Sequence, residues 1–446
     1  TTAATKTDTP LQETPTSIQV VPKQGIEDQK TPRIAEVLEN VSGVRTNQSL
    51  GSGNRFIIRG FADLGKMYRN GLLATSPSGF RTEIDTANVE SIEVLKGPAS
   101  ILYGRIEPGG MINVVTKRPL DTTHGALEQQ FGSYDFYRTL WDITGAVTDS
   151  KSLSVRFAGG YQNSGSFRDF NFTDRKIFNP SVTWRPTEST TITADVEILK
   201  HEYRPDFGIP IIGNRPAPVP ISRSYSDPNT PAAFTNKTHI GFHLDHTFNE
   251  SWKLTNRFLA SYLDTEDLWP NPTPAFGTAL QANGRTLNRN IFGQTSYVRT
   301  YATNLDLVGK FSVAETQHKV LIGLDYTRAT TDYFFFGNFN VSNPALAIDL
   351  FNPSYGIDPA LFRAARGITE RNGLNFNVFQ EQWYGLYGQD HITLGKRLHL
   401  LLGARYDWAE AGRGRGSNLE QAAAGVDAVT RKDSRFNPRV GLLYDL

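Results

Sequence analysis

Most of the chain alternates apolar and polar residues with the two-residue period of a β-strand that has one apolar face. Between residues 153 and 157, for example, Leu153, Val155 and Phe157 share one parity, whereas Ser154 and Arg156 share the other. The same alternation recurs along the chain and predicts about twelve strands, at residues 125–132, 137–147, 152–162, 176–185, 190–201, 238–248, 252–265, 297–311, 318–330, 382–395, 397–408 and 434–446. A tilted membrane strand needs about 9–11 residues, and the predicted strands are of that order.

The connections between these strands alternate between short and long. The short connections are residues 148–151, 186–189, 249–251 and 312–317, and the long ones are residues 203–237, 266–297, 337–380 and 411–433. Membrane barrels have short periplasmic turns and long external loops, and they place aromatic residues at both interfaces. Seven aromatic residues near strand ends suit such girdles: Trp141, Tyr161, Trp184, Trp252, Tyr262, Tyr406 and Trp408. The alternative is a large soluble β protein whose apolar parity faces a core.

The first 120 residues have a different pattern. Residues 1–16 are rich in Thr and Pro and predict a flexible segment, and residues 17–120 predict a small mixed domain. Thr31 and Pro32 form a helix start, and an apolar face follows it. Short strands are predicted at residues 55–61, 91–96 and 111–116, and the Asn-Gly pair at 70–71 predicts a tight hairpin.

Composition narrows the class of protein. Hydrophobic residues make up 38% of the 446 positions, and no apolar run reaches the ~18–20 residues of a spanning helix, so the chain is not a helical membrane protein. The 46 basic and 45 acidic residues nearly balance, which gives no reason to expect a nucleic-acid partner. The chain has no cysteine and therefore neither disulfides nor thiolate metal sites. It also lacks a signal peptide, so a secreted protein would be present here in mature or trimmed form.

Several motifs in the N-terminal domain resemble one family. They are TKTDTPL at 5–11, IIRGF at 57–61, VESIEVLKGP at 89–98, ILYG at 101–104 and PGGMINVVTKRP at 108–119. In this order and spacing they resemble the siderophore branch of the TonB-dependent outer-membrane receptors, most closely the ferrichrome or hydroxamate type. The barrel region is similar more loosely, through GARYDW at 403–408 and FNPRVGLLY at 436–444.

The resemblance implies an α+β plug domain inside an antiparallel transmembrane barrel of about 22 strands, of which about twelve are here. We therefore expect a flexible segment at 1–16, a plug at 17–120 and the first part of the barrel at 121–446, with the C-terminal strands lacking. The implied location is the bacterial outer membrane. The implied partners are a ferric siderophore, TonB of the inner-membrane complex and outer-membrane lipid. We expect a monomer without a cofactor, because the siderophore already carries the iron.

Likeness to hydroxamate-type receptors also implies ligand-binding positions. These are Gly65, Lys66, Phe80 and Arg81 in the plug and Phe207, Trp269 and Phe336 near the outer ends of barrel strands. Each aromatic residue could equally serve loop packing or a girdle. A neutral amide is common at the position of Lys66, and Arg81 adds a second charge. An anionic ligand therefore remains open beside a neutral one.

Arg59 and Lys96 occupy motif positions whose basic residues, in relatives, pair with glutamates of the barrel wall. The alternative is that both face water in the lumen. No metal site is expected, because His239 and His243 would lie about 13 Å apart on one strand. No catalytic constellation is present either, which argues against an enzyme. The hypotheses are thus active import of a ferric siderophore, import of haem, cobalamin or another chelate, and a passive porin or structural barrel.

Overall fold

The computed structural model describes residues 5–7, 16–49, 53–63, 66–75, 84–97, 99–272, 279–337, 343–367, 376–395, 397–428 and 430–444. The first part of the chain forms the predicted mixed domain, the plug. Its elements are β1 (Ser17–Pro22), α1 (Lys23–Gln29), α2 (Ile34–Leu38), β2 (Val44–Ser49), β3 (Gly53–Ile58), β4 (Phe61–Asp63), β5 (Tyr68–Arg69), β6 (Leu72–Leu73), η2 (Thr86–Asn88), β7 (Val89–Lys96), α3 (Ser100–Tyr103) and β8 (Gly110–Thr116).

The plug is built on a mixed sheet with the order β1-β7-β8-β5-β6, in which only β5 and β8 run parallel. Strands β2, β3 and β4 form a second small sheet. Apolar residues of α1 and α2 pack with both sheets; Ile34, Phe56 and Ile92 are fully buried there. The predicted hairpin at Asn70 and Gly71 is present, and both residues have positive φ, as such a tight turn requires.

The rest of the chain forms the wall, a single antiparallel sheet of twelve strands among the described residues. The strands are β9 (His124–Gly132), β10 (Phe136–Ala146), β11 (Leu153–Ser164), β12 (Thr173–Thr187), β13 (Thr190–Tyr203), β16 (Ala233–Thr247), β17 (Trp252–Pro272), β19 (Arg289–Val313), β20 (Thr316–Gly337), β22 (Phe376–Leu394), β23 (Leu398–Gly416) and β24 (Arg431–Tyr444). Among the residues that the structure describes the sheet is not closed, since β9 pairs only with β10 and β24 only with β23.

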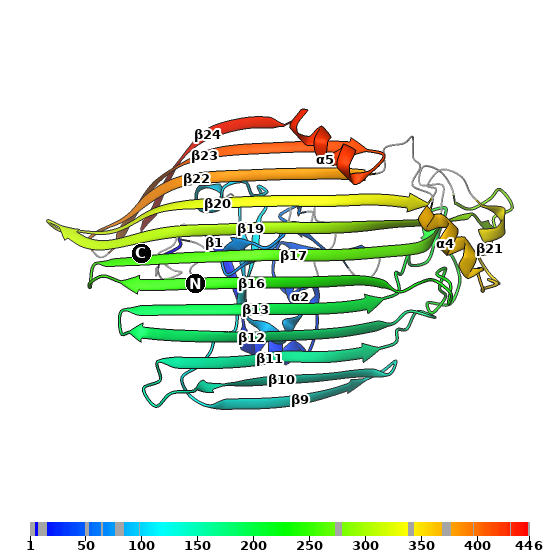
Figure 1. The fold of residues 1–446 in the computed structure, drawn as a ribbon, viewed down its shortest axis with the longest axis horizontal. Helices are drawn as coiled ribbons and strands as arrows, with labels where there is room; N and C mark the ends of the chain where they lie inside the picture. Colours follow the sequence, from blue (N-terminus) through cyan, green and yellow to red (C-terminus); the bar gives the residue numbers. More distant parts are fainter. Residues whose placement is uncertain are drawn as a thin grey trace.

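The predicted plug-and-sheet architecture and the number of strands are therefore confirmed, but several strands run further than predicted. Strand β19 begins at Arg289 rather than at residue 297, and β20 continues to Gly337 rather than to residue 330. Both extensions lie at the end that carries the long connections, on the right of Figure 1. Backbone pairing continues there beyond the length that a bilayer requires.

The long connections carry the remaining small elements: β14 (Ile211–Ile212), β15 (Arg215–Pro216), β18 (Thr286–Leu287), η3 (Pro344–Leu346), β21 (Ile348–Asp349), α4 (Pro359–Gly367) and α5 (Leu419–Ala428). The opposite ends of the strands are joined by tight turns, on the left of Figure 1. No helix in the described part of the chain is long and apolar enough to cross a membrane.

The two faces of the wall differ in the way that the period-two pattern predicts. On β20, Ile322 and Leu324 point outward and remain 51% and 52% exposed. On the opposite face Asp306 of β19 and Arg405 of β23 are each only 1% exposed. The plug, drawn in blue in Figure 1, lies against this polar face. The polar face is therefore the lumenal one, and the outward face carries the apolar residues that suit contact with lipid.

Plug contacts and candidate ligand site

The plug packs on the wall through small apolar patches. Leu72 and Ala74 contact Leu259 and Ala302 of the wall. Ile101 and Leu102 of α3 form a second patch with Leu321 and Tyr387, which lie on β20 and β22. These patches show which wall residues face inward, and they hold the plug against strands β17, β19, β20 and β22.

A buried carboxylate of the plug, Asp85, contacts two arginines of the wall. Both carboxylate oxygens of Asp85 accept hydrogen bonds from Arg138 of β10, at 3.0 and 2.7 Å, and Arg175 of β12 lies 3.5 Å away. The side chains of Asp85 and Arg138 are 0% and 3% exposed. Burial alone would raise the pKa of Asp85, but the guanidinium groups and the N–H of Ala87 outweigh it and lower the pKa.

A second buried pair joins the plug hairpin to β13, the strand next to β12 in the wall. Arg69 of β5 donates to Asp195 of β13 at 2.6 Å and lies 3.7 Å from Glu197. Glu197 also pairs with Lys237 of β16 at 2.8 Å. Because a lone buried charge is strongly unfavourable, these groups hold the hairpin at one position on the wall. This contact gives Arg69 a structural role.

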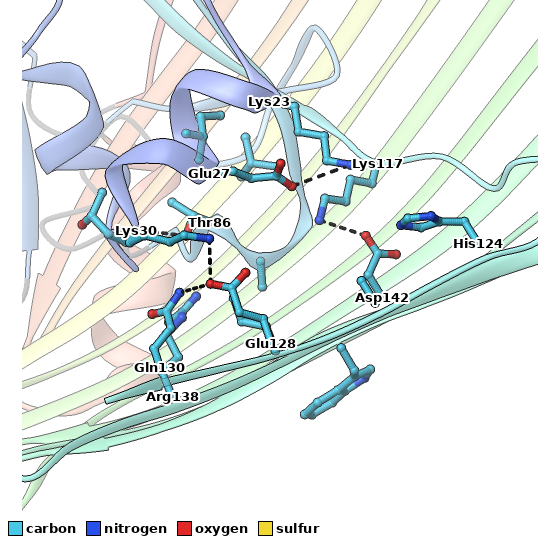
Figure 2. A pocket seen from close by; sticks show the side chains of 17 residues that line it. Lys23, Glu27, Lys30, Thr86, Lys117, His124, Glu128, Gln130, Arg138 and Asp142 are labelled. Atoms are coloured by element: carbon cyan, nitrogen blue, oxygen red, sulfur yellow. Dashed lines mark hydrogen bonds and ion pairs between the residues drawn. The ribbon is translucent and has the colours of Figure 1, made fainter. Parts of the chain in front are cut away.

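Ion pairs also connect the plug to strands β9 and β10. Figure 2 shows Lys30, just after α1, reaching Glu128 of β9 at 2.8 Å. Lys117 pairs with Asp142 of β10 at 3.0 Å, and the same carboxylate accepts two bonds from Arg156 of β11. Lys30 and Glu128 are exposed, so this pair contributes less than the buried ones.

The N-terminal residues 5–7 also lie inside the wall. Lys6 donates to the hydroxyl oxygen of Tyr387 at 2.7 Å, and the carbonyl of Thr5 accepts a bond from Gln389. Tyr387 in turn donates to Asp306 of β19. Burial lowers the pKa of Lys6, although Asp306 and Asp325 oppose this shift. The basic side chain is thus held on the lumenal face of β19, β20 and β22.

The two residues predicted to join plug and barrel have partners within the plug. Lys96 is buried and donates to Gln19 at 2.9 Å and to Ser42 at 3.0 Å. Burial, followed by the nearby charge of Arg59, lowers the pKa of Lys96. Arg59 is exposed, and its backbone N–H bonds to the carbonyl of Gly43. Pairing of Arg59 and Lys96 with wall glutamates stays a prediction.

A continuous row of aromatic rings lines the lumenal face near the outer ends of the strands; we call it the aromatic belt. Its members are Phe207, Trp269, Phe292, Phe335, Tyr333 and Phe379. The ring centroids of Phe207 and Trp269 are 5.6 Å apart, and those of Trp269 and Phe292 are 5.2 Å apart. The structure therefore brings together two of the three predicted barrel residues, Phe207 and Trp269.

The far end of the aromatic belt joins aromatic rings to a positive charge. Tyr333 stacks on Phe379 of β22 with ring planes 4° apart and centroids 5.6 Å apart. The guanidinium carbon of Arg413, on β23, lies 4.8 Å from the centroid of the Phe379 ring. Sequence reasoning missed Phe292, Phe335, Tyr333 and Phe379, although their parity on each strand signals the lumenal face.

Phe336 lies on the other side of the wall from the aromatic belt. It is 3% exposed and packs with Leu268, Phe362 and Ala365, the last two from α4. Leu268 and Phe336 are of the outward parity on their strands, whereas Phe335 faces the lumen. Ligand contact by Phe336 stays a prediction, and Phe335 is the residue of this strand that a ligand in the lumen would meet.

The predicted plug residues are described only in part. Gly65, Phe80 and Arg81 lie outside the described residues. Lys66 is buried at the plug apex, and its amine pairs with Glu107 at 2.9 Å. Next to this pair, Tyr68 packs edge-on against Tyr103 inside the plug. The amine of Lys66 thus faces a carboxylate that balances its charge.

This geometry suits the binding of a bulky chelate better than catalysis. The aromatic belt presents ring faces, and Arg413 presents hydrogen-bond donors beside them. Among the described residues no group of three or more His, Asp or Glu side chains is placed to hold a metal ion. A ligand that brings its own iron would need walls and donors of this kind and no protein ligands to the metal.

Comparison with known families identifies the class. The model of the TonB-dependent receptor plug domain matches residues 10–111, and the TonB-dependent receptor-like β-barrel model matches residues 178–446. The chain belongs to the TonB-dependent receptor family. The family comprises outer-membrane receptors that act as transporters and not as enzymes, in agreement with the expected location and chemistry.

Individual relatives agree with the siderophore branch. A metal-pseudopaline receptor of Pseudomonas aeruginosa is 30% identical over 445 residues, which is 100% of this chain and 60% of the relative. The ferrichrome outer-membrane transporter and phage receptor of Escherichia coli is 27% identical, over 99% of this chain and 60% of the relative. The ferrioxamine B receptor of Salmonella typhimurium is 29% identical, over 91% and 56%. The chain thus spans about 60% of the length of such relatives.

Solved structures share the fold. The ferric-catecholate import receptor Fiu of Escherichia coli, in its closed form, superposes with a TM-score of 0.84 at 20% identity, over 99% of this chain and 65% of that one. The ferripyoverdine receptor of Pseudomonas aeruginosa gives 0.80 at 19% identity, over 100% and 57%. At this identity the likeness concerns the fold alone.

Proposed function

We propose that the chain is the plug and part of the wall of a receptor that binds a ferric siderophore and imports it with energy transmitted by TonB. The observation that carries this proposal is the plug bound to the lumenal face beneath an aromatic belt. A ligand bound to the aromatic belt would lie between the outer ends of the strands and the plug. It can move inward only if the plug shifts against the wall.

Such a shift requires external work. The contacts of Asp85 and Arg69 with the wall are buried, and breaking one such buried pair costs roughly 3–5 kcal/mol when a charge is left behind. Several of these contacts must open together for a large solute to pass. A passive porin does not need a folded domain that is bound to its wall by buried ion pairs. Energy transfer through TonB supplies the missing work.

The proposed ligand surface includes both the aromatic belt and the residues predicted from the sequence. In the plug these are Gly65, Lys66, Phe80 and Arg81, and on the wall they are Phe207 and Trp269. Phe336, which is buried beneath α4 on the other face, would support the strand end that carries Phe335. Aromatic faces would cover the apolar parts of the siderophore, and Lys66 and the arginines would bond to its oxygens. Arg59 and Lys96 would hold the plug in place.

One relative favours a second candidate within the same class. The 30% identical protein that covers the whole chain is a metal-pseudopaline receptor, so the cargo could be a metal other than iron in a small chelator. The remaining alternatives, haem and cobalamin, have no specific support in the described residues. All of these cargoes share the same mechanism and differ in what the aromatic belt and the arginines recognise.

Uptake by intact cells tests the proposal. The full-length receptor would be produced in cells that lack their own siderophore receptors, with and without functional TonB, and radiolabelled iron would be supplied in a panel of siderophores. We expect accumulation of at least one complex, only when TonB is functional. Equal accumulation without TonB would point to a porin. Uptake of haem or another metal chelate, with no response to any ferric siderophore, would overturn the substrate class.

A further inference from the structure

Three arginines line one cavity at the outer end of β23 and β24; we call them the arginine cluster. Arg413, Arg415 and Arg431 line a cavity of about 590 Å³, together with Phe379 and Glu381 of β22. Arg431 lies opposite Ala411 in the strand register, so it shares the lumenal face with Arg413. The arginine cluster therefore continues the aromatic belt across the next two strands.

Two acids lie near the arginine cluster: Glu381 in the cavity, and Asp433, which is two residues from Arg431 on the same face of β24. Glu381, the carboxylate in the cavity, pairs with Arg105 of the plug at 3.1 Å. Arg413 donates to the amide oxygen of Asn377 and stacks on Phe379, and neither contact neutralises it. With Arg105 included, the four guanidinium groups and the two carboxylates of Glu381 and Asp433 carry a net charge of two positive.

Such an arrangement selects for negative charge in a ligand. Like charges held in one partly enclosed cavity repel, and an anion placed between them removes that repulsion. A guanidinium group donates two parallel hydrogen bonds to paired oxygens, as in a carboxylate or a catecholate. Phe379 adds a ring face beside these donors. Glu107 already balances Lys66 at the plug apex, so the excess charge lies on the wall at β23 and β24.

We propose that the arginine cluster is an anion subsite that selects ferric complexes with a net negative charge, held through carboxylate or catecholate oxygens. This inference rests on the proposed function, because it names the chemical class of the complex that is imported. It assigns Arg413, Arg415 and Arg431 to charge selection and Phe379 to contact with the ligand framework. A neutral trihydroxamate complex would gain little from the same residues.

Direct binding to the purified full-length receptor tests this site. Three ferric complexes of similar size would be compared: a neutral trihydroxamate, an anionic tris-catecholate and an anionic citrate-based chelate. For the wild-type receptor we expect Kd to be at least about tenfold lower for one of the anionic complexes than for the neutral one. The two anionic probes distinguish catecholate from carboxylate recognition.

Two variants locate the preference. Arg413→Gln combined with Arg415→Gln is expected to weaken anion binding by about fivefold per arginine, the upper range for exposed ion pairs, without changing binding of the neutral complex. The matched control is Lys432→Gln, because Lys432 is next to Arg431 on β24 but points to the other face, where it pairs with Glu410. Arg413→Lys retains the charge and should keep most of the preference.

Equal affinity for neutral and anionic complexes, or an unchanged Kd in the double glutamine variant, would overturn the anion subsite. If the double glutamine variant did not fold, a loss of preference in Lys432→Gln would overturn it equally. Uptake in cells is scored separately. TonB-independent entry of a complex that still binds through the arginines would overturn the proposed function and leave the arginine cluster standing as a binding site.

Discussion

Removing the charge of Asp85 should loosen the plug more than any change at its exposed contacts. Asp85→Asn keeps the shape of the side chain and its acceptor for the Ala87 N–H, but it leaves Arg138 and Arg175 without a carboxylate. Both partners of the main pair are buried, at 0% and 3% exposure of their side chains. Loss of one partner from such a pair costs roughly 3–5 kcal/mol.

Hydrogen exchange in the full-length receptor measures this effect. The amides of β7, which follows Asp85 and η2 in the chain, should exchange faster in Asp85→Asn by a factor that corresponds to those few kcal/mol. Lys30→Gln is the matched control, because it breaks an exposed plug–wall pair worth about 0–1 kcal/mol. Equal exchange rates in Asp85→Asn and Lys30→Gln would refute the reasoning that burial determines the strength of these contacts.

The same pair gives a pH dependence with a definite sign. The pKa of Asp85 is lower in the folded protein than its ordinary value of 3.8, so its charge stabilises the folded plug above that pH. The stabilisation is lost as the pH falls through the lowered pKa. The difference in β7 exchange between wild type and Asp85→Asn should therefore shrink in acid. A difference that grows on acidification would contradict the assignment.

Three other changes have expected outcomes. Phe379→Ala should raise the Kd of the bound siderophore by about fivefold, from the loss of an aromatic contact, whereas Phe376→Ala, of outward parity on the same strand, should not; equal effects would remove the aromatic belt from the site. Lys6→Met should expose the N-terminal segment to protease, because the bond to Tyr387 is lost, and unchanged cleavage would argue against that anchor. Phe336→Ala should speed hydrogen exchange in α4 by opening a cavity beneath it, and unchanged exchange would exclude that packing role.

The strand pattern could be predicted from the sequence because the alternation of faces is a local property. Leu324 and Tyr326 of β20, with the polar Asp325 and Thr327 beside them, suffice to define the strand and its two sides. Extending the same parity along β20 would have placed Phe336 outward and Phe335 inward. The signal that separates these two neighbours was therefore present in the sequence.

The contacts between plug and wall could not be predicted in this way. Arg69 and Asp195 are 126 positions apart, and nothing local in either segment indicates the other. The same holds for Asp85 and Arg138, which meet only because the plug lies against the wall. The aromatic belt likewise depends on the register of neighbouring strands, which long connections leave open in the sequence.

The division of the wall into a lipid face and a plug face is the claim on which the rest of the account depends. Single cysteines that carry spin labels would be placed at each position from 320 to 326 of β20, in a full-length receptor without other cysteines and in lipid bilayers. Collision rates with oxygen, which concentrates in the hydrocarbon, should be high at 320, 322, 324 and 326 and low at 321, 323 and 325. Equal rates at both parities, or the reverse order, would contradict the account.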